Sequence, residues 1–265
     1  MSQVFRNPEG GLIDRGRRLS FTFDGAAYHG FNGDTLASAL LANGVHLTGR
    51  SFKYHRPRGV FTAGPEEPNA LVELRGGARR EPNTRATVAE LFDGLEAVSQ
   101  NRWPSLALDA MAVNGLLSPF LPAGFYYKTF MWPARLWEKL YEPAIRRAAG
   151  LGRASGLEDP DRYERATLHC DVLVVGSGPA GLAAALAAAR GGARTVLAEQ
   201  DQRVGGNLLR TRATIDDSPG ANWAARVCRS FLDHESATLL TRTTVFGYYD
   251  HNVLGAAQRV ADHLR

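Results

Sequence analysis

Residues 170–200 read CDVLVVGSGPAGLAAALAAARGGARTVLAEQ, and this stretch decides the fold of the second half of the chain. The apolar run 168–175 is typical of a buried parallel strand, and the alanine-rich segment 179–191 predicts a helix. The segment 193–200 predicts a second strand. Together they predict a strand–helix–strand unit of the Rossmann type, in which a glycine turn joins the first strand to the helix.

The glycine turn at 176–181 has the G-x-G-x-x-G spacing of a dinucleotide-binding fingerprint. Gly176 lets the chain turn off the strand, Gly178 lets a pyrophosphate approach the backbone, and Gly181 lets the helix pack against the sheet. Glu199 ends the second strand, where an acidic residue accepts hydrogen bonds from the ribose hydroxyls and repels the 2′-phosphate of NADP. The turn therefore predicts a site for an ADP-containing dinucleotide. The alternative is a strand–helix–strand unit that binds no nucleotide.

A second glycine pair, Gly205–Gly206, follows the second strand. In many flavin-type Rossmann domains such a pair lets the next loop pass close to the dinucleotide; the alternative is an ordinary surface turn. Neither glycine motif separates FAD from NAD, because both cofactors carry an ADP half. A strand at 243–249 would bring backbone to the adenine. The predicted cofactor contacts are Gly176, Ser177, Gly178, Ala180, Gly181, Glu199, Gln200, Asp201, Gly205, Gly206, Asn207 and Val245.

The first hundred residues predict a small β-grasp-like module. After an extended arm at 1–18, short strands at 19–23 and 26–31 flank Asp24-Gly25, a strong hairpin signal. Asp34 or Thr35 begins a helix that ends at Gly44. Residues 69–74 alternate like a further strand.

The remaining segments complete a four-part division. Residues 101–150 are rich in aromatic side chains, which predicts a connector packed against a neighbouring surface, with a helix at 134–148 broken by Pro143. A polar linker follows, and residues 252–265 read as a terminal helix. The predicted domains are an arm (1–18), the β-grasp module (19–100), the connector and linker (101–167) and an incomplete Rossmann-type domain (168–265).

Composition excludes several classes of protein. Of 265 residues, 44% are hydrophobic and 22% charged, as in a globular protein with a core. The net charge of +4 is a near balance of 31 basic and 27 acidic residues, which does not favour nucleic acid as a partner. Two cysteines, Cys170 and Cys228, cannot form a disulfide framework or a cysteine metal cluster, which fits the cytoplasm. We expect no secretory signal and no membrane span.

Three further stretches carry a family resemblance: RSFKYHRPRGVFTAGPEEPNALVEL at 50–74, EPNTRATVAELFDGLEAVSQNRWPS at 81–105, and FYYKTFMWP at 125–133. In this order, ahead of the glycine turn, they resemble the α subunits of heterotetrameric sarcosine oxidases. The resemblance runs from about residue 18 to the end of the chain. Its motifs are far more specific than the glycine turn.

The resemblance implies a complex with β, γ and δ subunits that oxidises sarcosine to glycine. The removed carbon becomes formaldehyde, or 5,10-methylenetetrahydrofolate when folate is present, and oxygen becomes hydrogen peroxide. It also implies NAD, with FAD as the alternative, in the Rossmann domain of the α subunit, and FAD and FMN in the β subunit. Because the resemblance places the amine chemistry in another subunit, we expect no catalytic residue in this chain.

The chain departs from the family pattern in two ways. The family's α subunits are several times longer than 265 residues, which predicts a truncated form, without the folate-binding half, that is inactive alone. The N-terminal module also resembles plant-type ferredoxin domains, whose [2Fe–2S] cluster needs four cysteine thiolates. The loop at 60–70, VFTAGPEEPNA, has no cysteine, so we expect the fold without an iron–sulfur cluster.

The role of the basic segment at 50–58 stays open at the level of sequence. Its residues Arg50, Lys53, His55, Arg56 and Arg58 could meet a flavin phosphate or an acidic face of the β subunit, or could form a solvated loop. No metal-ligand spacing or nucleophile–base pair stands out along the chain. Two other functions compete: the FAD-binding α subunit of a related amine, opine or proline dehydrogenase, and a non-catalytic scaffold that docks the β subunit.

Overall fold

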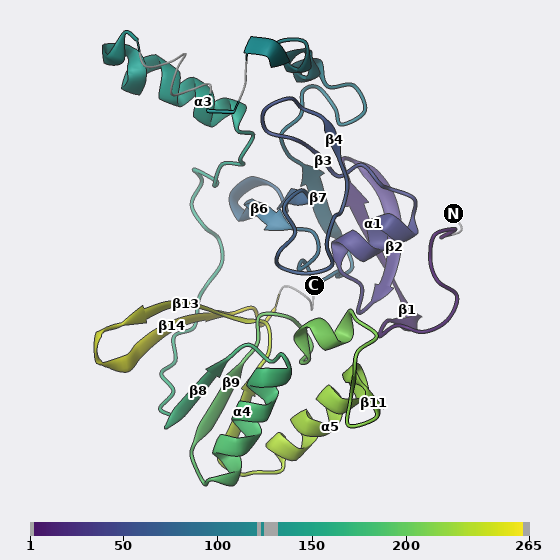
Figure 1. The fold of residues 1–265 in the computed structure, drawn as a ribbon, viewed down its shortest axis with the longest axis vertical. Helices are drawn as coiled ribbons and strands as arrows, with labels where there is room; N and C mark the ends of the chain where they lie inside the picture. Colours follow the sequence, from purple (N-terminus) through teal and green to yellow (C-terminus); the bar gives the residue numbers. More distant parts are fainter. Residues whose placement is uncertain (1–2, 121–122, 125–131, 262–265) are drawn as a thin grey trace. The chain divides into compact units, whose positions relative to one another are not determined.

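The computed structural model describes residues 3–120, 123–124 and 132–261. The chain forms two compact units, Met1–Arg162 and Tyr163–Arg265, each with its own core (Figure 1). The boundary falls inside the segment that the sequence predicts as a linker. No helix within the described ranges is both long enough and apolar enough to cross a lipid bilayer.

The first unit is built on a five-stranded sheet in the order β2-β1-β7-β5-β6. Its strands are β1 (Asp14–Phe23), β2 (Ala26–Asn32), β5 (Leu71–Leu74), β6 (Glu81–Arg85) and β7 (Leu95–Ser99). β1 and β7 run parallel, and every other neighbouring pair is antiparallel. The predicted hairpin is confirmed, because Asp24 (φ 49°) and Gly25 (φ 79°) reverse the chain between β1 and β2. β1 begins within the predicted arm.

One helix, α1 (Leu36–Ala42), covers the sheet. The predicted start is confirmed, since the Thr35 side chain accepts a hydrogen bond from the Ser38 amide, and Gly44 (φ 80°) follows the end of the helix. The core between helix and sheet includes Leu19, Phe21, Leu36, Leu40, Val72 and Leu95. The short strands β3 (Gly49–Arg50) and β4 (Pro57–Arg58) and the 3₁₀ turn η1 (Gly77–Arg79) lie outside this sheet.

A buried carboxylate organises the loop between β4 and β5. Glu67 is 1% exposed. One of its carboxylate oxygens accepts hydrogen bonds from the amides of Phe61 and Thr62 at 2.8 and 2.6 Å, and the other from Asn69 and Ala70 at 2.8 and 3.2 Å. Burial opposes ionisation, but these backbone hydrogen bonds outweigh it and hold the pKa of Glu67 below its ordinary value of 4.5.

We expect Glu67→Gln to destabilise the first unit by about 2–4 kcal/mol, because an amide NH₂ group would replace an oxygen that faces two buried N–H donors. Chemical denaturation at pH 7 measures the effect. Glu66→Gln is the matched control, since Glu66 is exposed and its replacement should leave stability unchanged.

The pH dependence gives the same prediction a second readout. A lowered folded-state pKa contributes stability that is complete above the unfolded value near 4.5 and is lost as the pH falls further. The stability difference between the wild-type protein and Glu67→Gln should therefore shrink below about pH 4.5. A difference that stays constant down to pH 3 would contradict the assignment of this stability to the ionised carboxylate.

The connector contains short helical pieces. These are η2 (Ala110–Gly115), η3 (Ser118–Phe120), η4 (Ala134–Leu136), η5 (Trp137–Tyr141), a π-helical turn, and α3 (Glu142–Ala148). Pro143 does not break the predicted helix; it is the second residue of α3, which follows directly on the π-helical turn η5. The described tryptophans Trp103, Trp132 and Trp137 are exposed, so the predicted burial is not met within the chain. The aromatic residues 125–127 and 130 lie outside the described residues.

The second unit contains a parallel sheet in the order β12-β9-β8. It comprises β8 (Val172–Val175), β9 (Thr195–Ala198) and β12 (Ala237–Leu240), with α4 (Pro179–Arg190) and α5 (Gly220–Leu232) beside it (Figure 1). The predicted strand–helix–strand unit is confirmed, because β8 and β9 pair in parallel from Val172 opposite Thr195 to Val175 opposite Ala198. The core contains Leu182, Leu197, Trp223, Val227 and Phe231.

The predicted terminal helix at 252–265 is wrong for the residues that the structure describes. β13 (Thr243–Tyr249), the turn η7 (Asp250–Asn252) and β14 (Val253–Gln258) form an antiparallel hairpin. His251 and Asn252 have positive φ values of 61° and 58°, which end helical geometry and reverse the chain. Three short elements, η6 (Gly206–Leu209), β10 (Thr214–Ile215) and β11 (Ser218–Pro219), connect β9 to α5.

Candidate dinucleotide site

The glycine turn lies between the end of β8 and the first turn of α4. Gly176 has φ 92°, a value that favours glycine, and Gly178 precedes the helix with φ −63°. Pro179 occupies the first helical position, where it fits without losing a hydrogen bond. The next two amides, of Ala180 and Gly181, have no acceptor inside the helix, and the helix dipole adds positive potential there. This end of α4 therefore suits a phosphate.

The three glycines of the fingerprint have different surroundings. A Cβ added at Gly178 would meet no atom within 4 Å, so the space in front of this backbone is open. A Cβ added at Gly181 would lie 1.9 Å from the carbonyl oxygen of Gly176, so the first helical turn packs directly on the glycine turn. Gly178 therefore borders open space, and Gly181 is required for packing.

The second glycine pair lies against the first motif. Gly205 and Gly206 have φ values of 128° and 52°, and a Cβ added at Gly206 would lie 3.1 Å from the Cα of Gly178. The Gly205 amide donates to the Ser177 carbonyl oxygen at 2.9 Å. The loop after β9 thus lies beside the glycine turn.

Ser177 and Glu199 form a buried link between the glycine turn and the end of β9. One carboxylate oxygen of Glu199 accepts from the Ser177 amide at 2.7 Å and from the Ser177 hydroxyl at 2.5 Å. The other accepts from the Asp201 amide at 2.9 Å. The side chain of Ser177 is fully buried, and that of Glu199 nearly so. Glu199 therefore holds the turn in shape, and its contact with a ribose remains a prediction.

The remaining predicted residues surround this link. Gln200 and Asn207 are exposed, while Asp201 is half-buried and pairs with Arg210 at 2.7 Å. Burial raises the pKa of Asp201 above its ordinary value, and the charge of Arg210 opposes that rise. Val245 lies in β13, two residues beyond Thr243, whose amide donates to the Glu199 carbonyl oxygen at 2.7 Å.

Sequence reasoning missed two basic residues at this edge. Arg210 binds Asp201, and the Arg259 guanidinium donates to the Gln200 carbonyl oxygen at 3.2 Å. No motif or spacing indicates either contact, because the partners are 9 and 59 residues apart. Both arginines bring positive charge to the end of β9, where the carboxylates of Glu199 and Asp201 lie.

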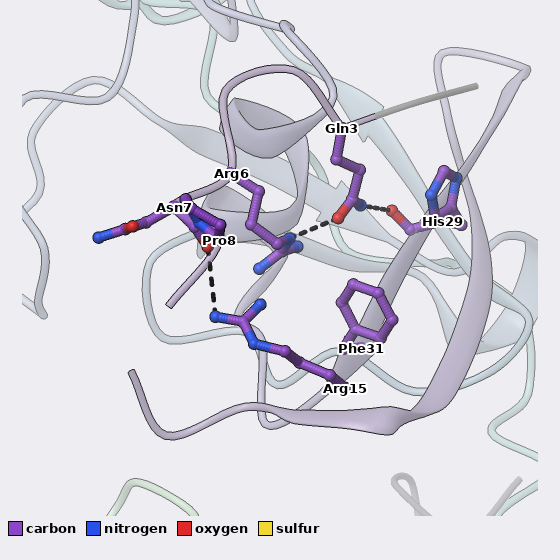
Figure 2. A pocket seen from close by; sticks show the side chains of 7 residues that line it. All are labelled: Gln3, Arg6, Asn7, Pro8, Arg15, His29 and Phe31. Atoms are coloured by element: carbon purple, nitrogen blue, oxygen red, sulfur yellow. Dashed lines mark hydrogen bonds between the residues drawn. The ribbon is translucent and has the colours of Figure 1, made fainter. Parts of the chain in front are cut away.

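A surface hollow of about 320 Å³ in the first unit is a second candidate site (Figure 2). Its walls hold Arg6, Arg15, His29 and Phe31, but both guanidinium groups are already engaged. Arg6 pairs with Asp34 at 2.7 Å, and Arg15 donates to the carbonyl oxygens of residues 7 and 10. Burial and the nearby Arg18 lower the pKa of His29. The hollow is thus where the N-terminal arm is fastened to β2, not a site of paired reacting groups.

Metal ligands do not cluster in the part of the chain that the structure describes: no three His, Cys, Asp or Glu residues lie close enough to hold an ion. The glycine turn therefore remains the best-formed candidate site.

Comparison with known families gives two matches, one in each unit. A family model described as a 2Fe-2S iron-sulfur cluster binding domain matches residues 16–102. A second, described as an FAD dependent oxidoreductase, matches residues 171–258 and includes the whole glycine turn.

Curated relatives cover almost all of this chain. It is 62% identical to the sarcosine oxidase subunit alpha of Rhizobium meliloti (strain 1021) over 98% of its own length and 26% of the relative's. It is 38% identical to the protein of the same name from Corynebacterium sp. (strain U-96), over 96% of this chain and 22% of the relative. The chain spans about a quarter of the length of these relatives.

A solved structure supports the fold alone. L-proline dehydrogenase from P. horikoshii superposes with a TM-score of 0.55 over 92% of this chain and 38% of that chain, at 17% sequence identity.

The cofactor prediction is wrong on two points. The resemblance implies NAD as the nucleotide, with FAD as the alternative, but the family match over the glycine turn is to FAD-dependent oxidoreductases. The sequence also predicts that no iron–sulfur cluster is bound, whereas the first unit matches a 2Fe-2S cluster binding domain. The glycine spacing could not identify the nucleotide, since it is typical of a site for the ADP half that FAD and NAD share.

The residues present fit the two implied groups differently. The open backbone at Gly178 and the amides of α4 fit a dinucleotide pyrophosphate. A [2Fe–2S] cluster is held by four thiolates, and both cysteines of the chain, Cys170 and Cys228, lie outside residues 16–102. The matched region therefore lacks thiolate ligands, and no reaction step is derived through a cluster.

Proposed function

Because the chain is homologous over nearly its whole length to the α subunits of sarcosine oxidase, we propose that it is the dinucleotide-holding portion of such a subunit. The complex it belongs to oxidises sarcosine to glycine. The methyl carbon leaves as formaldehyde, or as 5,10-methylenetetrahydrofolate when folate is present, and oxygen is reduced to hydrogen peroxide. The observation that carries the proposal is the open glycine turn inside a chain 62% identical to a sarcosine oxidase subunit alpha.

We propose FAD as the dinucleotide. The match of residues 171–258 to FAD-dependent oxidoreductases supports this choice. A bound FAD would supply a ring system that accepts two electrons. The chain's own part is to bind and orient: the amides of Ala180 and Gly181 face the pyrophosphate, and Glu199 and Asp201 lie at the ribose edge.

The other predicted contacts have supporting roles in this proposal. Ser177 keeps the turn in the shape that exposes Gly178, because its hydroxyl and amide both bind Glu199. Gly205 and Gly206 let the second loop lie close to the turn without a side chain in between. Gln200 and Asn207 border the site from the exposed side, and Val245 offers backbone to the adenine.

The nucleotide is identified by releasing it. The chain is produced with the β, γ and δ subunits, the complex is purified, and the chain is then separated from the others. Denaturation of the separated chain should release FAD in a 1:1 ratio, identified by mass and by its yellow absorbance. Release of NAD, or of no nucleotide, would contradict the proposal. Sarcosine-dependent formation of hydrogen peroxide, with proline as the comparison substrate, tests the reaction separately.

A further inference from the structure

The Glu199 carboxylate is buried and already bound to the protein. An acidic side chain at the end of the second strand usually accepts hydrogen bonds from the ribose hydroxyls of a dinucleotide. Here its two oxygens bind the amide and hydroxyl of Ser177 and the amide of Asp201, and the residue is 5% exposed. The choice between a free and a phosphorylated ribose therefore depends on the side chains beside Glu199 as well.

Two oppositely charged side chains lie next to it. The Asp201 carboxylate is 2.7 Å from a guanidinium nitrogen of Arg210. The two side chains are 16% and 20% exposed, so solvent and a ligand can still reach them. Among the described residues, the Arg210 side chain hydrogen-bonds to no acceptor other than Asp201. A guanidinium carries five N–H donors, so most of those of Arg210 are available to a ligand.

The backbone fixes both members of this pair. The Asp201 amide donates to the Glu199 carboxylate at 2.9 Å, and the Asp201 carbonyl oxygen accepts from the Arg242 amide at 3.0 Å. Arg210 follows directly on η6, and its amide donates to the Asn207 carbonyl oxygen at 3.0 Å. The ion pair therefore joins two segments whose backbone positions are already set.

The loop that carries Arg210 also borders the glycine turn. The turn η6 begins at Gly206, and a Cβ added there would lie 3.1 Å from the Cα of Gly178. The side chain of Arg210 reaches from this loop to Asp201, just after the end of β9. In dinucleotide-binding folds the adenosine ribose lies at the end of this strand, and an arginine nearby accommodates a 2′-phosphate. Arg210 therefore has both the chemistry and the position of a 2′-phosphate ligand.

The ion pair suppresses that chemistry. The charge of Asp201 offsets the charge of Arg210, and it would repel a phosphate brought to the same place. Burial raises the pKa of Asp201, Arg210 lowers it, and the neighbouring Glu199 raises it again. A second cation, Arg259, also favours the ionised form, but its guanidinium donates to the Gln200 carbonyl oxygen. Arg210 is therefore the arginine that Asp201 holds directly.

We propose that the Asp201–Arg210 pair makes this site specific for an adenosine ribose with a free 2′-hydroxyl. Asp201 is a positioning residue, which holds and neutralises an arginine that would otherwise bind a 2′-phosphate. FAD and NAD carry the free hydroxyl, and NADP carries the phosphate. The inference rests on the proposed function, because it takes the dinucleotide site at the glycine turn as given. It gives to the pair a selection that the sequence assigns to Glu199 alone.

The test compares two ligands that differ only in the 2′-phosphate. ADP-ribose and 2′-phospho-ADP-ribose are titrated calorimetrically into the nucleotide-free full chain, and the wild type should prefer ADP-ribose. In Asp201→Ala, the affinity for 2′-phospho-ADP-ribose relative to ADP-ribose should rise by about 10- to 100-fold, as one hydrogen bond to a charged group contributes. Binding of ADP-ribose itself should stay near the wild-type value, which shows that the site is intact.

Second-site variants and a matched control identify the cause of the gain. Asp201→Ala/Arg210→Ala should return the affinity ratio to the wild-type value. Asp201→Ala/Arg259→Ala should keep the gain, because the Gln200 carbonyl oxygen holds that guanidinium. Asp233→Ala removes one exposed carboxylate at the end of α5 and should leave the ratio unchanged. Asp201→Asn keeps the size of the side chain but removes its charge, and should shift the ratio in the same direction as Asp201→Ala.

The proposal is wrong if neither Asp201→Ala nor Asp201→Asn raises the ratio in chains whose β9 and α4 amides keep wild-type hydrogen exchange. It is also wrong if the gain survives the loss of Arg210, or if Asp233→Ala shows the same gain.

FAD is titrated into the same preparations to separate this inference from the proposed function. A wild-type chain that binds FAD, with no gain in the Asp201 variants, overturns the specificity assignment alone. A wild-type chain that binds neither FAD nor ADP-ribose overturns the proposed function and this inference together.

Discussion

Gly178→Val is expected to abolish dinucleotide binding while the second unit stays folded. Gly178 has φ −63°, which valine adopts without strain, and a Cβ there meets no protein atom within 4 Å. The side chain would instead fill the space through which the pyrophosphate approaches the amides of α4. Loss of two charge-assisted hydrogen bonds, at about 1.5–3 kcal/mol each, corresponds to roughly 100-fold weaker binding or more.

Calorimetric titration of the nucleotide-free chain with FAD measures this loss, and amide hydrogen exchange in α4 shows that the fold is intact. Gly156→Val serves as the control, because Gly156 also borders open space but lies in the other unit. If Gly178→Val bound FAD like the wild type, the glycine turn would not be the site. If the wild-type chain gave no heat with FAD or NAD, the scaffold function would be favoured.

Gly181→Ala is expected to destabilise the fold, whereas Gly178→Val is expected to weaken binding. The second unit should lose about 3 kcal/mol or more of stability, because the added methyl group overpacks against backbone atoms. The new Cβ would lie 1.9 Å from the Gly176 carbonyl oxygen, which belongs to the backbone and cannot rotate away. Alanine is the better helix former by about 1 kcal/mol, so helix propensity alone predicts the opposite sign. A destabilised variant would therefore show that packing decides this position.

Hydrogen exchange of the β8 and α4 amides measures the effect, since it reports on the second unit alone. Gly178→Ala is the matched control: the same single methyl group is added three residues away in open space. Equal exchange in the two variants would contradict the close approach of the helix to the turn.

The part of the site that is local in sequence could be predicted from sequence. α4 and β9 lie where the sequence predicts them, and β8 occupies only the second half of the predicted strand 168–175 and is partly exposed rather than buried. The helix α1 and the Asp24-Gly25 hairpin are also predictable, because they are local in sequence. Capping and turn residues lie directly beside the elements that they define.

The contacts that join distant segments could not be predicted. His55 and Asp109 are 54 residues apart, and neither carries a motif that selects the other. Glu67 reads as one of two adjacent glutamates, and only the folded loop distinguishes it from the exposed Glu66. The hairpin at 243–258 reads in sequence as a strand and a helix because a short apolar run fits both periods.

The glycine fingerprint could not identify which dinucleotide binds. The predicted contacts of the turn and of Glu199 are with the ADP half that FAD and NAD share, so they do not distinguish the two cofactors. The match of residues 171–258 to FAD-dependent oxidoreductases, and not the glycine spacing, is what favours FAD.

The buried link between Ser177 and Glu199 restricts how this site can evolve. Glu199 spans from the glycine turn to the Asp201 amide with one oxygen at each end. An aspartate is one methylene shorter and could not keep both contacts, so a lineage that shortens residue 199 must rebuild the turn as well. Residues 177 and 199, 22 positions apart, are therefore expected to vary together among homologues, even though substitution at either one alone would leave the glycine fingerprint intact.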